Sequence, residues 1–294
     1  MQIRDSGWRF ATALVGLDMS PSSDVLVEWL PNLRLLGTTT LILLHVVPEH
    51  IVAELLAGIV SVDKVVEEQR RKALGKLAEY ASMLERYGFE VEVPRPKIGN
   101  PAGWIVRASE AYGADYIVLG SRGHGLLREL LLGSVVEEVL HASRKPLLIA
   151  RIRRSPDGEP VQPPPLKGTV VAAIDFNLYL EDVYTCSVEV AEHTGNPLTL
   201  LHVLEPGEDP ILARERLEKL AEKARHRGLA VNTRLLEGKP GKRIIEEAAR
   251  LDAALIIVGP GLSRTSPIGA TTETVVRRAQ TNVLVCRRAP AVQE

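Results

Sequence analysis

Glycine and serine residues between positions 120 and 134 are spaced in a way that suits the binding of phosphate groups. Gly120 and Gly123 let the backbone turn tightly and approach a ligand with no Cβ in between. Gly133 and Ser134 precede a run of helical character, and the free N–H groups at a helix N-terminus favour anions. Three further side chains of this segment are able to pair with anionic oxygens: Arg122, His124 and Arg128. The segment therefore predicts a phosphate-binding loop.

Asp18 is a second residue whose position suggests chemistry. It follows the short apolar run Thr12–Leu17, which is typical of a strand. Because ligands of open α/β sheets bind outside the carboxyl ends of the strands, we expect Asp18 and Gly120 to face the same site. The carboxylate can accept hydrogen bonds from a ribose hydroxyl or a base, so the two features together predict a nucleotide site. The plainer alternative is that the glycines form only a turn and that Ser134 only caps a helix.

The elements that must position these residues occur twice along the chain. Asp175 ends an apolar run 157 residues after Asp18, and His202 stands in the sequence LLHV 157 residues after His45. Three more landmarks recur in the same order, namely GNP and GKP, IVLG and IIVG, and PLLIAR and NVLVCR. Recurrence in one order indicates an internal repeat, so we expect two similar domains in tandem.

We place these domains at residues 1–151 and 169–294, with residues 152–168 as a linker. The linker contains five prolines. Prolines at this density favour a stiff, extended spacer with no core of its own.

Each copy alternates short apolar runs with segments of helical periodicity. In the first copy the expected strands are Thr12–Leu17, Thr40–Val47, Glu90–Arg95, Tyr116–Leu119 and Pro146–Ala150. Several of these runs are almost continuously hydrophobic, as is usual for parallel strands covered on both faces. Strands that alternate with helices predict an α/β fold with a doubly wound parallel sheet in each copy.

Composition excludes several classes of protein. The 294 residues include 36 Lys and Arg and 37 Asp and Glu, which gives a formal net charge of -1. The chain therefore lacks the excess of basic residues expected of a nucleic-acid-binding protein. The longest apolar runs are too short to span a bilayer, and the N-terminus has no signal-peptide cleavage pattern. We therefore expect a soluble cytoplasmic protein that binds neither nucleic acid nor membrane.

The two cysteines and two strand histidines are interpreted as structural. Cys186 and Cys286 do not have the spacing of metal ligands, and two cysteines are too few for a disulfide framework. A reducing compartment is therefore expected. Both residues are expected to be small buried side chains. His45 and His202 lack a second ligand at a suitable spacing, so hydrogen-bonded strand histidines are expected rather than a metal site.

The pattern G-x2-G-x9-G-[ST], formed here by Gly120, Gly123, Gly133 and Ser134, resembles the ATP-binding signature of the universal stress protein family. The sequences VGLD, LLHV, GNPA and IVLGSRGHG support the resemblance, which extends over both copies. It implies two tandem open five-stranded parallel sheets with helices on both faces. This is a Rossmann-like fold of the adenine nucleotide α-hydrolase type.

The resemblance also implies a nucleotide site in the first copy. Asp18 matches the position that holds adenine or ribose, and Val46 matches one that contacts the base through its backbone. The remaining matches are Leu119 and Gly120 beside the base and ribose, and Arg122, Gly123, Gly133, Ser134 and Val135 along the phosphates. The implied ligand is ATP, or ADP or AMP, with or without Mg²⁺.

The second copy departs from this pattern. Gly259 and Gly261 are followed by only seven residues before Gly269, and Ala270 replaces the serine. The loop between them holds one basic residue, Arg264. We therefore expect the second domain to bind a triphosphate weakly or not at all.

Three functions remain open on the sequence. The first is a nucleotide-binding regulatory or stress-response protein whose surface changes with its ligand. The second is a slow ATPase or nucleotidyl-transfer enzyme, although no P-loop lysine motif and no nucleophile–base pair can be found. The third is a scaffold that binds no nucleotide. The resemblance further implies an intramolecular pseudo-dimer formed through the last strands of the two copies, with a homodimer of chains as a further option.

Overall fold

The computed structural model describes residues 7–49, 62–121, 132–176, 179–261 and 267–287. The chain forms two compact units. The first-repeat unit consists of Phe10–Ser143 and Ile152–Gln162, and the second-repeat unit consists of Met1–Arg9, Arg144–Arg151 and Pro163–Glu294.

The first-repeat unit has an open parallel sheet in the strand order β3-β2-β1-β5, with β4 paired to the far end of β2. These strands are β1 (Thr12–Leu17), β2 (Thr40–Val47), β3 (Glu90–Glu92), β4 (Lys97–Ile98) and β5 (Tyr116–Gly120). The chain passes between them through α1 (Pro21–Trp29), the 3₁₀ helix η1 (Leu30–Leu36), α3 (Val62–Glu85), α4 (Pro101–Ala111) and, after β5, α5 (Ser134–Ala142).

The second-repeat unit has five parallel strands in the order β11-β10-β9-β12-β13. They are β9 (Val170–Ala173), β10 (Leu198–Leu204), β11 (Val231–Glu237), β12 (Leu255–Val258) and β13 (Asn282–Val285). The helices are α6 (Leu180–Thr194), α7 (Pro210–Arg225), α8 (Pro240–Arg250) and α9 (Ala270–Arg278). The strand order reverses between β9 and β12, which is where ligands of such sheets bind.

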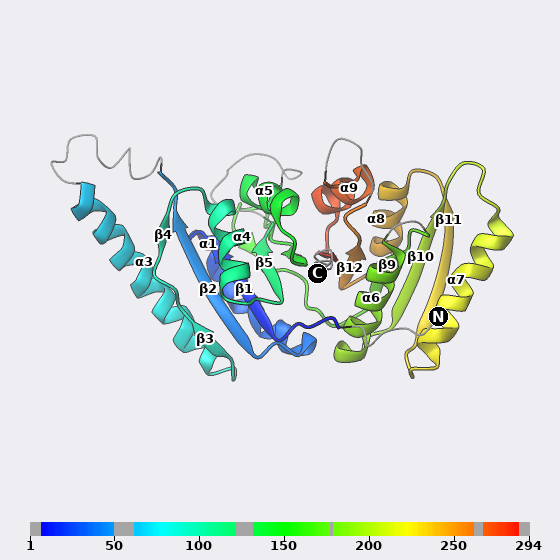
Figure 1. The fold of residues 1–294 in the computed structure, drawn as a ribbon, viewed down its shortest axis with the longest axis horizontal. Coiled ribbons are helices and arrows are strands. Elements are labelled where there is room, and N and C mark those ends of the chain that lie inside the picture. The colour runs from blue at the N-terminus through cyan, green and yellow to red at the C-terminus, as the bar shows by residue number, and fades with distance from the viewer. Residues whose placement is uncertain (1–6, 50–61, 122–131, 177–178, 262–266, 288–294) are drawn as a thin grey trace, which may run out of the picture. The chain divides into compact units, whose positions relative to one another are not determined.

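Helices cover both faces of the sheet in each unit (Figure 1). In the second-repeat unit α8 contacts α9 on one face, while on the other face the Tyr184 hydroxyl of α6 donates to the Leu220 carbonyl of α7 at 3.0 Å. In the first-repeat unit α4 contacts α5, and the Tyr80 hydroxyl of α3 donates to the Asp24 carboxylate of α1 at 2.7 Å. The two-sided cover explains the almost unbroken burial of the central strands. The predicted α/β fold in two tandem domains is confirmed.

The last strand of the first repeat, β6 (Leu147–Ala150), pairs antiparallel with β13 inside the second-repeat unit. Leu148 lies opposite Leu284 in this pair, and all four residues of each strand are buried. The Asn282 side chain accepts the backbone N–H of Arg151 at 3.0 Å, which fixes the end of β6. The predicted contact between the last strands of the two copies is therefore present.

The Pro-rich segment is not a bare spacer, as the sequence had suggested. It contains a small antiparallel pair, β7 (Arg153–Arg154) with β8 (Pro160–Val161). Ile152 and Leu166 are both buried, at 2% and 1% exposure, so the segment contributes to the two cores at either end. The expectation failed because proline density reports backbone stiffness and does not weigh the apolar residues between the prolines.

The cysteine interpretation was wrong about bonding: Cys186 and Cys286 form a disulfide that connects α6 to the residue after β13, so the two cysteines no longer argue for a reducing compartment. Both residues are fully buried, as expected, but they are not free thiols. A separation of 100 residues in sequence gave no pairing signal, and only the packing of α6 against the sheet brings them together.

Among the described helices, none combines the length and the hydropathy needed to cross a membrane.

Removing this disulfide is expected to destabilise the protein. The bond closes a loop across 100 residues of sequence, and such cross-links stabilise folded proteins by about 2–4 kcal/mol. We expect Cys186→Ser to lower the urea midpoint of unfolding, and a reducing agent to lower that of the unmodified protein to a similar degree. The variant itself should not respond to the reducing agent. Identical midpoints for the protein with and without reductant contradict a stabilising bond.

Candidate functional site

The strand register of the first-repeat unit brings the predicted site residues to one edge of the sheet. Leu17 of β1 pairs with His45 of β2, and Gly16 of β1 pairs with Leu119 of β5. The residues that follow these pairs are Asp18, Val46 and Gly120, so all three stand at the carboxyl ends of adjacent strands. Leu119 and Val46 are buried, whereas Asp18 and Gly120 are partly accessible.

Asp18 is held by hydrogen bonds from the turn that follows it. Its Oδ1 atom accepts from the Ser20 N–H at 3.0 Å, from the Ser20 hydroxyl at 2.6 Å and from the Ser23 hydroxyl at 2.8 Å. The backbone N–H of Asp18 donates to the Ser23 oxygen at 3.0 Å, which closes the ring of contacts. Three donors to one oxygen hold the carboxylate in one orientation, as a preformed binding site requires.

The turn between Asp18 and Ser20 is strained. Met19 has a φ of 62°, in the left-handed region that a residue with a long side chain rarely adopts. Backbone strain of this kind persists where surrounding contacts impose it, and it is concentrated at ligand-binding sites. Here the serine bonds to Asp18 supply those contacts.

The start of α5 lies beside the end of β5. The Gly133 N–H donates to the Ser121 carbonyl at 3.2 Å, and Ser121 follows β5 directly. The cap residue Gly133 offers no side-chain hydrogen bond to the first turn of α5. The N–H groups of Ser134 and Val135 thus begin a helix whose positive end has no capping side chain of its own, which fits an anionic ligand.

Seven of the nine residues predicted for the site are therefore at this edge of the sheet. The other two, Arg122 and Gly123, lie outside the described residues. Sequence reasoning did not identify Ser20 and Ser23 as partners of Asp18. The signal was the run Asp-Met-Ser-Pro-Ser-Ser, in which two serines stand within reach of a carboxylate at a strand end.

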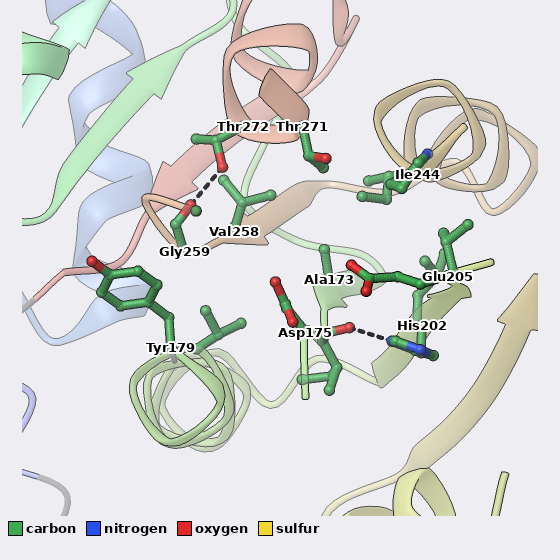
Figure 2. A pocket seen from close by; sticks show the side chains of 16 residues that line it. Ala173, Asp175, Tyr179, His202, Glu205, Ile244, Val258, Gly259, Thr271 and Thr272 are labelled. Carbon is green, nitrogen blue, oxygen red and sulfur yellow. Dashed lines mark hydrogen bonds between the residues drawn. The ribbon is translucent and has the colours of Figure 1, made fainter. Parts of the chain in front are cut away.

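The corresponding edge of the second-repeat unit contains a cavity of about 100 Å³ (Figure 2). Its walls come from the ends of β9, β10 and β12 and from α6, α8 and α9. The apolar lining residues are Ala173, Ile174, Val183, Leu201, Val203, Pro240, Ile244 and Val258. Figure 2 shows the Glu205 side chain extending toward Asp175 at this edge.

The loop that follows β12 is closed by its own hydrogen bonds. The Thr272 hydroxyl donates to the Gly259 carbonyl at 2.7 Å, and the Gly269 N–H donates to the Pro260 carbonyl at 2.8 Å. Gly261 has a φ of 76°, and a Cβ there would lie 3.1 Å from the Gly269 Cα, so the turn requires glycine. Thr272, which the sequence analysis did not single out, thus shapes the pocket.

His202 forms part of the pocket and is paired on both sides of its ring. Its Nδ1 atom lies 2.8 Å from the Ile174 carbonyl, and its Nε2 atom lies 2.8 Å from a Glu208 carboxylate oxygen. The carbonyl and the carboxylate hold the imidazole ring from two sides. His45 makes the same Nδ1 contact, to the Leu17 carbonyl at 2.8 Å. The expected hydrogen-bonded strand histidines are confirmed, but the Glu208 partner was missed.

Among the described residues no group of three or more His, Cys, Asp or Glu side chains is arranged to hold a metal ion. In the part of the chain that the structure covers, the Nδ1 atoms of His45 and His202 contact backbone carbonyl oxygens.

The fold and the two strand-end sites define a tandem doubly wound α/β protein with a candidate site at the carboxyl edge of each sheet. The family model described as "Universal stress protein family" matches residues 9–151 and 168–287. The chain belongs to the universal stress protein family.

Three relatives show the extent of the similarity. A universal stress protein of Methanocaldococcus jannaschii is 33% identical over 151 residues, which are 47% of this chain and 93% of the relative. One of Mycolicibacterium smegmatis is 27% identical over 296 residues, covering 93% of this chain and 96% of the relative. The crystal structure of a universal stress protein from Archaeoglobus fulgidus is 29% identical with a TM-score of 0.78, and the match covers 95% of this chain and 99% of that one. The similarity to the latter two thus extends over both repeats of this chain.

The contact between His202 and Glu208 predicts a dependence of stability on pH. Burial opposes ionisation of Glu208, but the hydrogen bonds from His202 and from the Glu205 N–H outweigh it and lower the pKa of the carboxyl below 4.5. A carboxyl whose pKa is lower in the folded state contributes stability that is present above its unfolded pKa and is lost as the pH falls through the folded value.

We therefore expect Glu208→Gln to lower the free energy of unfolding by about 1–2 kcal/mol at neutral pH. The difference from the unmodified protein should shrink as the pH falls below about 4. Urea unfolding of both proteins across this range measures it, with Glu205→Gln as the control because that neighbouring side chain is exposed. A difference that stays constant with pH contradicts the assignment.

Proposed function

We propose that this universal stress protein binds one adenine nucleotide at the carboxyl edge of the first-repeat sheet and acts as a nucleotide-dependent regulatory protein in the stress response. The observation that carries the proposal is the meeting of a preoriented Asp18 carboxylate, the backbone at Val46 and Gly120, and the uncapped start of α5. A nucleotide needs the same three things, namely an acceptor for a hydroxyl or amino donor, an apolar wall and an anion site.

Each residue has a role in this proposal. Asp18 accepts hydrogen bonds from the ribose or the base, and the backbone of Val46 contacts the base. Leu119 and Gly120 lie beside the base and ribose. The phosphates lie against the segment that carries Arg122, Gly123, Gly133, Ser134 and Val135. The ligand is ATP, ADP or AMP, with Mg²⁺ as the natural companion of the longer phosphate chains.

The regulatory mechanism is linkage between ligand and surface. A nucleotide that binds one arrangement of the loops around the site better than another shifts the population toward it. The bound and free proteins then present different surfaces to a partner in the cytoplasm. This role requires binding of the nucleotide and no hydrolysis. An assay for ADP and phosphate distinguishes it from a slow ATPase.

Removing the carboxylate charge of Asp18 tests the proposal. Asp18→Asn keeps the size of the side chain but replaces one acceptor oxygen by a donor, so a hydroxyl of the ligand loses its partner. We expect the affinity for ATP, measured by calorimetry, to fall by about tenfold or more. Ser134→Ala should weaken ATP more than it weakens adenosine, because it removes a hydroxyl near the phosphates only.

Asp175→Asn is the matched control, since Asp175 is the equivalent residue of the second repeat. It should leave the affinity for ATP unchanged. Equal losses in both variants, or ATP binding that neither variant alters, contradict a site in the first repeat.

A further inference from the structure

The outer strand of the second-repeat sheet has an open edge. Among the described strands, β11 pairs with β10 alone, over all seven of its residues, and it stands at the margin of the sheet (Figure 1). Its sequence VNTRLLE contains no proline, and every residue after Val231 is partly or fully exposed. The edge of such a strand presents a row of backbone N–H and C=O groups on which another strand can add.

The corresponding edge of the first repeat is interrupted. There β3 pairs with β2 over three residues, Pro94 and Pro96 follow, and β4 then pairs with the far end of β2. Proline has no backbone N–H, so this edge offers no continuous ladder to a further strand. Interruptions of this kind usually protect edge strands from association, and β11 lacks one.

The alternation of the backbone shows which groups of β11 face away from β10. The Leu198 N–H of β10 donates to the Ala230 carbonyl at 2.8 Å, so Ala230 faces β10. Because backbone groups of successive residues in a strand point alternately to its two sides, the odd-numbered residues of β11 face outward. The outward groups available to a further strand belong to Thr233, Leu235 and Glu237.

The first outward position of β11 is closed by a side chain. The Val231 carbonyl accepts from Nε and Nη2 of Arg225, at 3.2 and 3.0 Å. Such contacts agree with an outward direction of this carbonyl and place a positive charge at the beginning of the edge. The open part therefore runs from Thr233 to Glu237, the end of the strand.

A second β11 strand fits this edge in an antiparallel register centred on Leu235. Residues that exchange backbone hydrogen bonds across an antiparallel pair must both face outward. With Leu235 opposite Leu235 of a second copy, Thr233 lies opposite Glu237, and Arg234 lies opposite Leu236. This register therefore uses the open backbone groups and sets no like charges opposite one another.

Charge complementarity supports the same register. Glu237 lies diagonal to Val231 of the second copy, where the Arg225 guanidinium is held, so opposite charges meet. Because β11 ends at Glu237, the added strand stops short of that guanidinium. Shifting the strands toward Val231 instead sets Arg234 opposite Arg234 and requires the carbonyl that Arg225 already occupies.

We propose that β11 is a dimerisation strand, through which two copies of this chain join antiparallel about a two-fold axis at Leu235. The two second-repeat sheets then continue into one another. Because the corresponding edge of the first repeat is interrupted, this pairing closes with two copies and does not extend into a filament. The inference does not depend on the nucleotide site proposed for the first repeat.

A proline on the outward side of β11 tests the pairing. Leu235→Pro removes an outward N–H and leaves the N–H groups that donate to β10 in place. We expect the unmodified chain to be a dimer by light scattering at concentrations well above micromolar. The variant should be a folded monomer by light scattering and circular dichroism, with a dimer dissociation constant at least about tenfold higher.

Val91→Pro is the matched control, at the edge strand of the first repeat. The Glu90 N–H donates to the Thr39 carbonyl at 2.9 Å, so Val91 faces away from β2 by the same alternation. This variant should remain a dimer.

Cross-linking tests the register without proline. Because Cys186 and Cys286 are joined, an introduced cysteine is the one available thiol in the described part of the chain. Leu235→Cys should give covalent dimers with a short thiol cross-linker. Asn232→Cys is the control, since Asn232 is exposed and lies about 20 Å along the strands from its counterpart.

An unmodified chain that is monomeric above micromolar concentration overturns the proposal. A dimer that persists in Leu235→Pro, or that is lost to the same degree in Val91→Pro, also overturns it. Cross-linking of Asn232→Cys as readily as of Leu235→Cys contradicts the register centred on Leu235. None of these results bears on ATP binding, whose absence is what contradicts the proposed function.

Discussion

The alignment of β1 between β2 and β5 is the constraint on which the first-repeat site depends. Parallel pairing places Leu17 beside His45 and Gly16 beside Leu119, so the three strands end at the same level of the sheet. The pairing of the three strands brings Asp18, Val46 and Gly120 together, whatever their own side chains are. The Ser20 and Ser23 bonds then fix the carboxylate, and the contact between Gly133 and Ser121 brings the start of α5 to the same edge. The site is a consequence of sheet geometry that a few polar contacts refine.

The same geometry recurs in the second repeat with different side chains at the strand ends. The strand order and the Nδ1 contact of the strand histidine are kept, with His202 in the position of His45. What has changed is the set of side chains that the strand ends present, above all Glu205. The backbone of the two sheets therefore sets the place of the candidate site, whereas the side chains at the strand ends set its chemistry.

Much of this could be predicted from the sequence, and the failures have physical causes. Strands such as Thr40–Val47 were found with their observed bounds, because buried parallel strands are continuous apolar runs. The internal repeat predicted the order of strands and helices in the second domain from that in the first. The Cys186–Cys286 bond was missed because a separation of 100 residues contains no pairing signal. Glu208 was missed as the partner of His202 because the contact depends on how the chain turns after β10. Contacts within a turn or between distant elements are set by the folded backbone, and residue types alone do not reveal them.

The most direct test of one nucleotide site per chain is the identity and amount of what the protein carries. The protein is purified without added nucleotide and denatured, and the released small molecules are quantified by mass spectrometry. The account predicts one equivalent of ATP, ADP or AMP per chain, or one equivalent bound when ATP is titrated into protein that carries none. Two equivalents of phosphorylated nucleotide contradict the difference between the repeats. No nucleotide after purification, together with no binding on titration, contradicts the function proposed for the first repeat.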